Sequence, residues 1–160
     1  MANALSIGDI LELDCKNGFA YVAFSGKDAT LGAAVWVIPK IYSEPQHDWE
    51  SVFANKGYFV FYAANTALKH RLVRRVAHSI EAMKMLPGPR RNAIRTDKNG
   101  KVVRWVITEG DKRVPKADHE LSESDRLLPI ADMWNHQFLL AKIAAGWMPE
   151  DGDRSFANTD

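Results

Sequence analysis

The sequence has few of the features that usually fix a protein's function or location. Cys15 is the only cysteine, so no disulfide can form within the chain, and a cysteine-based zinc site is not expected. No apolar run approaches the ~18 residues that suggest a membrane span. The first residues, MANALSIGDILELD, lack the charged start and long apolar stretch of a signal peptide. These absences predict a cytoplasmic protein with no membrane association.

Catalytic and cofactor-binding motifs are also missing. The serines stand in no nucleophile motif, and the glycines form no phosphate-binding pattern. None of the five histidines has the spacing to cysteine or carboxylate that is typical of zinc ligands. We therefore expect no catalytic residues, no metal and no cofactor.

An enzyme remains an open alternative because of two short polar segments. His119 lies between Asp118 and Glu120, an arrangement that can support acid–base chemistry, and His136 begins the last predicted helix. An unrecognised enzyme or ligand-binding protein would need His119, His136 or Asp118 to converge with other polar groups in a pocket. A solvated loop with acidic neighbours is the simpler interpretation of His119.

The length and composition predict one folded domain. The chain has 160 residues, of which 46% are hydrophobic and 26% charged, and this balance is typical of a globular protein rather than a disordered one. We expect a single domain over residues 1–150 and a polar, disordered tail over residues 151–160.

Most of the chain has the pattern of antiparallel strands. Apolar and polar residues alternate in DILELDC, and Asn17 and Gly18 form a turn that would pair Leu13 with Val22. Proline cannot donate to a ladder, so the third strand should end before Pro39. The expected strands cover residues 9–15, 19–24, 32–38, 58–62 and 73–80, with a short helix between residues 41 and 56. A three-stranded meander is expected after residue 89, with turns at Asn99–Gly100 and Gly110–Asp111.

The C-terminal part changes to a helical pattern. Ser122 and Asp125 form a capping box for one short helix, and Asp132 is the expected N-cap of a second, apolar helix that ends at Gly146. Together these patterns predict an α+β fold. We expect a bent, mostly antiparallel and partly barrel-like sheet of six to eight strands, with the C-terminal helices packed on it.

Charge is distributed unevenly along the chain. Residues 66–104 contain eleven Lys and Arg against two acidic residues, a formal charge of +9, whereas the whole chain carries only +1. Such asymmetry indicates an interaction surface. The densest part is PRRNAIRTDKNGKVVRW, residues 89–105, which we call the basic hairpin. Its cations are Arg90, Arg91, Arg95, Lys98, Lys101 and Arg104.

The strand pairing expected within the basic hairpin suggests that these cations have a function beyond folding. With Asn99 and Gly100 as the turn, Arg95 lies opposite Arg104, and like charges so placed oppose strand pairing by roughly 0.2–1 kcal/mol. A partner protein with an acidic patch is one explanation. Trp49 lies in a segment between two expected strands, where an aromatic residue either pins that segment or contacts a partner, and we include it among the candidate contacts. Another is that the cations only protect a sheet edge from aggregation.

Nucleic acid is a second possible partner. Guanidinium groups match phosphate oxygens in two-point geometry, and the candidate contacts are Arg74, Arg75, Arg90, Arg91, Arg95 and Arg104. The sequence pI of about 7.9 favours an acidic protein instead, because dedicated nucleic-acid-binding domains typically have a pI above ~9.

The segment IGDILELDCKNGFAYVAF resembles the start of one family of bacterial immunity proteins from polymorphic-toxin systems, the family numbered twenty-six. The similar features are a Gly-Asp start to a strand, a glycine turn and an aromatic returning strand, at Gly8, Asp9, Gly18, Phe19 and Tyr21. The segments LLPIADMWN and AAGWMP resemble those of uncharacterised bacterial proteins. The first resemblance implies a non-enzymatic α+β protein that neutralises a toxin by binding it.

Overall fold

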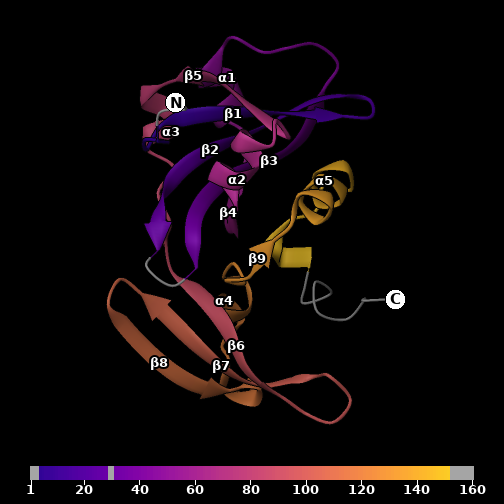
Figure 1. Ribbon diagram of the computed structural model, residues 1–160. Helices are drawn as coiled ribbons and strands as arrows, with labels where there is room; N and C mark the ends of the chain where they lie inside the picture. The colour runs from indigo at the N-terminus through magenta and orange to yellow at the C-terminus, as the bar shows by residue number, and fades with distance from the viewer. Residues whose placement is uncertain (1–3, 29–30, 152–160) are drawn as a thin grey trace. The chain divides into compact units, whose positions relative to one another are not determined.

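The computed structural model describes residues 4–28 and 31–151, and it confirms the α+β class (Figure 1). The predicted tail, residues 151–160, lies outside the described residues except for Asp151. The chain divides into two compact units. Unit 1 comprises Met1–Pro87 and Met133–Trp147, and unit 2 comprises Gly88–Asp132 and Met148–Asp160.

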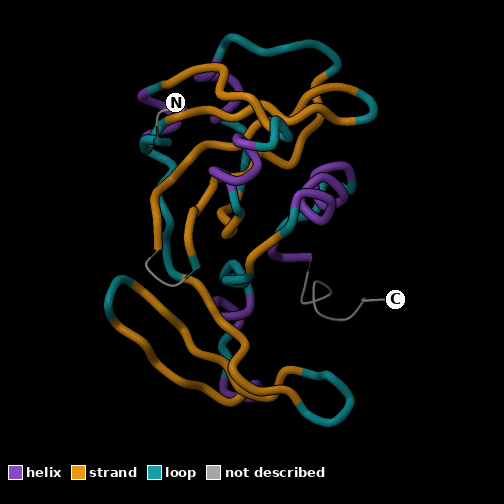
Figure 2. Tube along the Cα trace, viewed as in Figure 1, coloured by secondary structure: helices purple, strands orange, loops and turns teal. Residues whose placement is uncertain are grey.

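Unit 1 is built on a six-stranded sheet with the order β5-β1-β2-β3-β4-β9. All neighbours are antiparallel except β4 and β9, and β5 and β9 are not paired within the described residues, so the sheet is open rather than a closed barrel. Figure 2 shows β2 and β3 curving along their length. The strands are β1 (Asp9–Cys15), β2 (Gly18–Asp28), β3 (Gly32–Tyr42), β4 (Tyr58–Tyr62), β5 (Val73–His78) and β9 (Met133–Trp134).

Helices cover this sheet because its strands are apolar. One cluster joins Ile10, Tyr21 and Ile38 of the sheet to Val52 of α1 and Ala82 of α3. Helices α2 and α5 contact β3, and Leu139 and Ile143 of α5 are buried. The helices of unit 1 are α1 (Trp49–Phe53), α2 (Ala64–Lys69), α3 (Ile80–Met83) and α5 (His136–Ala144).

Unit 2 contains a three-stranded antiparallel meander with the order β6-β7-β8. Its core is formed by Val102, Trp105, Leu121 and Ile130, with Ile107 packed against them. The predicted capping box of Ser122 and Asp125 is present at α4. The elements are β6 (Arg90–Thr96), β7 (Val102–Glu109), β8 (Lys112–Ala117), the 3-10 turn η1 (Asp118–Glu120), α4 (Glu123–Arg126) and the 3-10 turn η2 (Pro149–Asp151). Residues 4–28 and 31–151 thus form nine strands in two sheets, not one sheet of six to eight strands.

Three of the predicted strands have different bounds in the structure. Strand β2 covers Gly18–Asp28 rather than residues 19–24, and β5 ends at His78 rather than at residue 80, because Ser79 is the N-cap of α3. The first hairpin turns at Lys16 and Asn17, so Leu13 pairs with Ala20 and Gly18 belongs to β2. This register differs from the predicted one by two residues and therefore keeps the same side chains on each face. Strand β3 also continues through Pro39 to Tyr42, because a bulge between the Phe19–Tyr42 and Tyr21–Ile38 pairs accommodates the missing N–H.

The N-cap of the last helix was also predicted at the wrong residue. Asn135, not Asp132, caps α5, and its side chain accepts a hydrogen bond of 2.8 Å from the N–H of Phe138. Met133 and Trp134 are extended because they pair with β4, which displaces the helix start toward the C-terminus. At the other end, Gly146 has the left-handed φ of 63° that was expected for a glycine after the helix.

All four tyrosines of the chain lie in unit 1, and they give the folded state a predictable response to alkali. Burial raises the pKa of each, to about 12 for Tyr62 and, with the help of the Glu12 carboxylate, to about 12 for Tyr21. Between pH 10 and 12 the unfolded chain loses phenolic protons that the folded chain keeps, so stability falls as the pH rises.

We therefore expect near-ultraviolet absorbance to report little tyrosine ionisation around the ordinary pKa of 10, and then a cooperative step that coincides with the loss of circular dichroism. Non-cooperative titration at the ordinary pKa, with the fold intact, would contradict this expectation.

Candidate functional site

The basic hairpin is formed by β6, β7 and the loop between them, residues 97–101. The structure confirms that Arg95 lies opposite Arg104. A bulge changes the register just before this pair, so Ala93 rather than Ile94 faces Trp105, and Ile94 is an extra residue in β6. Ile94 is 48% exposed and adjoins Arg95. The bulge therefore places an exposed apolar side chain beside the facing arginines.

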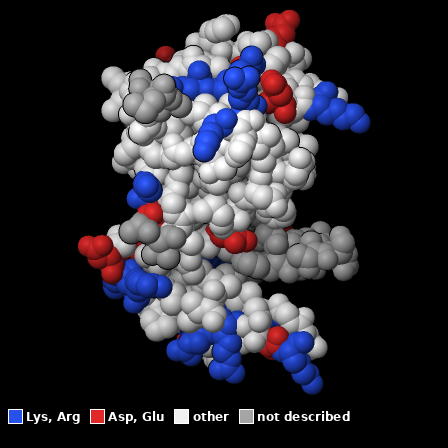
Figure 3. All heavy atoms as spheres, in the orientation of Figure 1, with Lys and Arg blue, Asp and Glu red and all other residues white. Residues whose placement is uncertain are grey.

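Four of the six predicted cations are exposed and have no acidic partner. Arg95, Lys98, Lys101 and Arg104 are exposed, and none of them forms an ion pair within residues 4–28 and 31–151. We call these four residues the cation cluster. Figure 3 shows Lys and Arg atoms gathered over the part of the surface that belongs to β6, β7 and β8.

Two acidic residues of unit 2, Asp97 and Asp125, have specific partners. Asp97 accepts hydrogen bonds from the N–H groups of Asn99 at 2.8 Å and Lys101 at 3.0 Å, so its carboxylate closes the loop. The Lys116 ammonium, 2.7 Å away, and the N–H of Ser122 hold the pKa of Asp125 below its usual value. Asp97 thus lies within the loop of the cation cluster, but its carboxylate bonds to main-chain N–H groups and forms no ion pair with the four cationic side chains.

Asp118 is likewise engaged elsewhere. It accepts a 2.9 Å hydrogen bond from the indole N–H of Trp105 and lies 3.7 Å from Arg126. His119, next to it, is exposed. These contacts hold η1 and α4 against the meander, so Asp118 has a structural role in unit 2.

Arg91 does not belong to the exposed set, contrary to the prediction that it contacts a partner. It is 1% exposed, and its guanidinium lies 4.7 Å from the ring centroid of Trp105. It donates hydrogen bonds to the carbonyl oxygens of Leu128 at 3.2 Å and Arg126 at 2.9 Å. Arg91 therefore joins the last residue of α4 and the segment that follows it to the meander. Arg90, opposite Thr108, is half-buried.

Trp49 has the contacts expected of the pinning role, one of the two alternatives predicted for it. It begins α1 in unit 1, whereas the cation cluster is in unit 2. Its ring is half-buried and packs edge-on against Tyr21, with 5.2 Å between the ring centroids. Trp49 thus pins the segment before β4 to the core, and its contact surface is used within the molecule.

The two arginines of β5 that were candidates for phosphate contact are engaged in ion pairs with β1. Arg74 pairs with the buried Glu12 and, at 3.5 Å, with Asp14. Arg75 lies 3.3 Å from the buried Asp9. Burial tends to raise the pKa of Asp9, but its hydrogen bonds from Ser6 N–H, His78 and Arg75 outweigh that effect and lower it. Both guanidinium charges are therefore balanced within unit 1.

His136, the remaining candidate for catalysis, is paired with a core tyrosine. Its Nδ1 lies 2.8 Å from the hydroxyl of Tyr62, and burial lowers the pKa of the imidazole. Asp118 and His119 belong to unit 2, so the three candidates fall in different units. Over the described residues, no group of three His, Cys, Asp or Glu side chains is arranged to hold a metal ion.

Comparison of the chain with models of known protein families, with curated proteins and with solved structures found no match. In the part of the chain that the structure describes, no helix has the length and apolar character needed to cross a bilayer.

Proposed function

We propose that this protein binds an acidic surface of another protein through the cation cluster of unit 2. The observation that carries the proposal is that four cations of one hairpin are exposed and form no ion pair within the described residues, while the Asp97 carboxylate in the same loop is hydrogen-bonded to main-chain N–H groups. Unbalanced exposed charge favours association with a surface of opposite sign.

The apolar neighbour of the cluster favours a protein partner over nucleic acid. Ile94 is exposed beside Arg95, and a central apolar contact rimmed by charge is typical of protein interfaces. A phosphate backbone offers no matching apolar group. Arg74 and Arg75, which the nucleic-acid alternative also required, are balanced by carboxylates in unit 1.

The resemblance of the first hairpin suggests an immunity-like role, in which binding neutralises a toxin without catalysis. A basic immunity surface fits a toxin with an acidic exposed face better than one that binds nucleic acid through a basic face of its own.

The proposal predicts the result of affinity capture from a nuclease-treated lysate of the source organism. The amount of partner captured by the double variant Arg95→Glu, Arg104→Glu should be at least about tenfold lower than that captured by the wild type, because two attractive contacts become repulsive. The matched control Lys112→Glu, Arg113→Glu changes the net charge equally on exposed residues of β8 and should retain it.

Two results would contradict the proposal. Equal capture by the wild type and the Arg95→Glu, Arg104→Glu variant would remove the cation cluster from the interface. Tight binding of duplex DNA, with a salt slope close to ~0.9 per neutralised phosphate that falls in this variant, would establish the nucleic-acid alternative instead.

A further inference from the structure

Arg71 occupies a backbone position that usually requires glycine. Helix α2 ends in a Schellman motif, in which the N–H of Arg71 bonds to the carbonyl of Leu68 at 3.1 Å and the N–H of Leu72 to that of Ala67 at 2.9 Å. This motif places Arg71 in the left-handed region, with φ of 58°.

The same unit contains a second Schellman motif that shows the usual solution. At the end of α5 the N–H of Gly146 bonds to Ile143 and that of Trp147 to Lys142, and Gly146 has φ of 63°. Among the described residues, Arg71 is the only non-glycine residue with positive φ. A side chain is strained at this position, and strained residues concentrate at functional sites. The positive φ of Arg71 therefore suggests that its side chain has a function.

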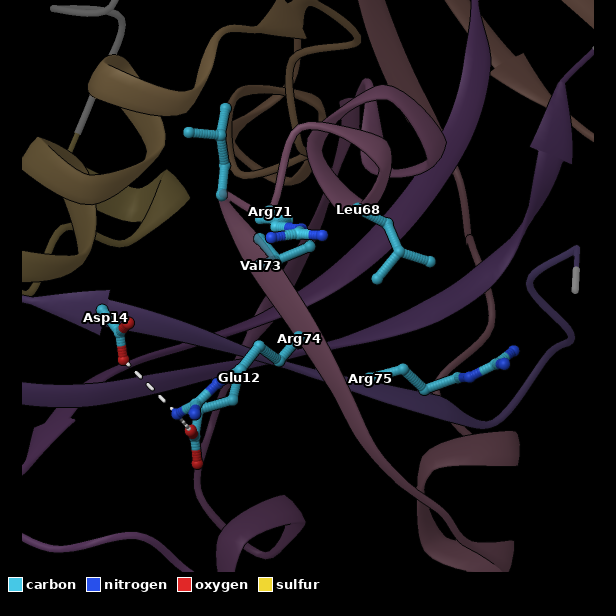
Figure 4. Close-up of a pocket in the computed structure, with 8 residues that line it drawn as sticks. Glu12, Asp14, Leu68, Arg71, Val73, Arg74 and Arg75 are labelled. Atoms are coloured by element: carbon cyan, nitrogen blue, oxygen red, sulfur yellow. Dashed lines mark hydrogen bonds and ion pairs between the residues drawn. The ribbon is translucent and has the colours of Figure 1, made fainter. Parts of the chain in front are cut away.

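Arg71 lines a pocket of about 480 Å³ beside β5, within the range of roughly 300–1,000 Å³ typical of small-molecule sites. In Figure 4, Arg71, Val73 and Leu68 lie together, apart from the ion-paired group of Glu12, Arg74 and Asp14. The pocket is lined by Glu12, Asp14, Leu68, Arg71, Leu72, Val73, Arg74 and Arg75.

The charges of the pocket leave one cation available. Arg74 is engaged by Glu12 and Asp14, and Arg75 pairs with Asp9. Arg71 is exposed and forms no ion pair within the described residues. Beside it are Leu68, Val73 and Leu72, of which Leu72 is 45% exposed. The pocket therefore combines one unbalanced guanidinium with an apolar wall.

We infer that this pocket binds an organic monocarboxylate with an apolar body. The planar guanidinium of Arg71 matches both oxygens of a carboxylate, and Leu68 and Leu72 cover the hydrocarbon part. A phosphate dianion fits less well, because it would face the carboxylates of Glu12 and Asp14 with only one unbalanced cation. The inference concerns unit 1 and does not depend on the cation cluster.

The ligand chemistry can be tested with hexanoate and its neutral analogue hexanamide. Hexanoate should shift the NMR methyl signals of Leu68, Leu72 and Val73 with a saturable, low-millimolar or tighter affinity, and hexanamide should bind at least about tenfold more weakly. The affinity of N-acetylleucine, compared with that of hexanoate, distinguishes two sources of the carboxylate. Tighter binding of N-acetylleucine would assign the pocket to peptide C-termini, and weaker binding would assign it to free carboxylic acids. Absence of saturable shifts with both carboxylates, or equal binding of hexanamide, would overturn the inference.

The role of Arg71 can be separated from any role in folding. Arg71→Gly should leave the melting temperature unchanged or raise it, because glycine adopts the left-handed conformation freely, while hexanoate affinity falls about tenfold or more. Lys69→Ala, which removes a cation from the same helix outside the pocket, should not alter affinity. Undiminished binding by Arg71→Gly, or a clear loss of its stability, would overturn the assignment of Arg71 to ligand recognition.

Discussion

Arg91→Ala is expected to lower the free energy of unfolding of unit 2 by about 3–5 kcal/mol, although arginine is ordinarily a surface residue. The substitution removes the donors to the carbonyl groups of Arg126 and Leu128 and the cation stacked on Trp105. Buried carbonyls without donors each cost about 1–3 kcal/mol, and the lost side-chain volume leaves a cavity beside the indole ring.

Urea denaturation followed by NMR measures this effect unit by unit. In Arg91→Ala, the signals of residues 88–132 should disappear at lower urea than in the wild type. Arg95→Ala is the matched control, since it removes an exposed arginine of the same strand that faces Arg104. It should leave stability unchanged or raise it by up to about 1 kcal/mol. Equal losses in the two variants would show that Arg91 has no special structural role.

Gly18→Ala is expected to be almost as damaging to unit 1, with a loss of about 3 kcal/mol or more. Gly18 has φ of 146°, and a Cβ atom there would lie 2.0 Å from the carbonyl oxygen of Tyr42. Because this oxygen belongs to the backbone of β3, the contact cannot be relieved by a change of rotamer.

Gly26→Ala separates the two sources of that loss. Gly26 is in the same strand with a similar φ of 139°, but the nearest atom to an added Cβ is Ile7 Cδ1 at 4.0 Å. It should therefore show only the conformational cost, about 1–2 kcal/mol. Thermal unfolding measures the loss of stability in each variant, and the difference between the two losses is the contribution of the Tyr42 contact. If the two variants lose equal stability, the close approach of β2 to β3 is not the cause.

Features set by neighbouring residues could be predicted from the sequence. The capping box at Ser122 and the glycine end at Gly146 follow from local rules for caps. The facing of Arg95 and Arg104 was predicted from a two-residue turn at Asn99 and Gly100, but that turn was wrong: the loop covers residues 97–101, and a register shift between Arg95 and Thr96 keeps the predicted pair. The errors have long-range causes. The turn at Lys16 and Asn17 leaves Gly18 within β2, where it passes close to Tyr42, and a two-residue change of register is invisible to hydrophobic alternation.

The candidate sites likewise include features that depend on neighbouring residues, which could be predicted, and features that depend on long-range contacts, which could not. The sequence indicated the exposed cations of the basic hairpin, but it could not distinguish Arg91 from Arg90 or Arg95, because the burial of Arg91 depends on Trp105 and on the carbonyl groups that follow α4. The pocket beside β5 was missed. Its only local signal is a helix that ends before a strand without a glycine, at Arg71.

Unit 1 is discontinuous in sequence, and this has a consequence for synthesis on the ribosome. Strand β9 and helix α5 come from Met133–Trp147, after nearly all of unit 2. While the meander is being translated, β4 has not yet met β9, and the apolar surface of β3 that α5 contacts has no cover. The nascent chain therefore carries an incomplete sheet for some forty-five residues of elongation, an interval in which chaperones would have their best access to it.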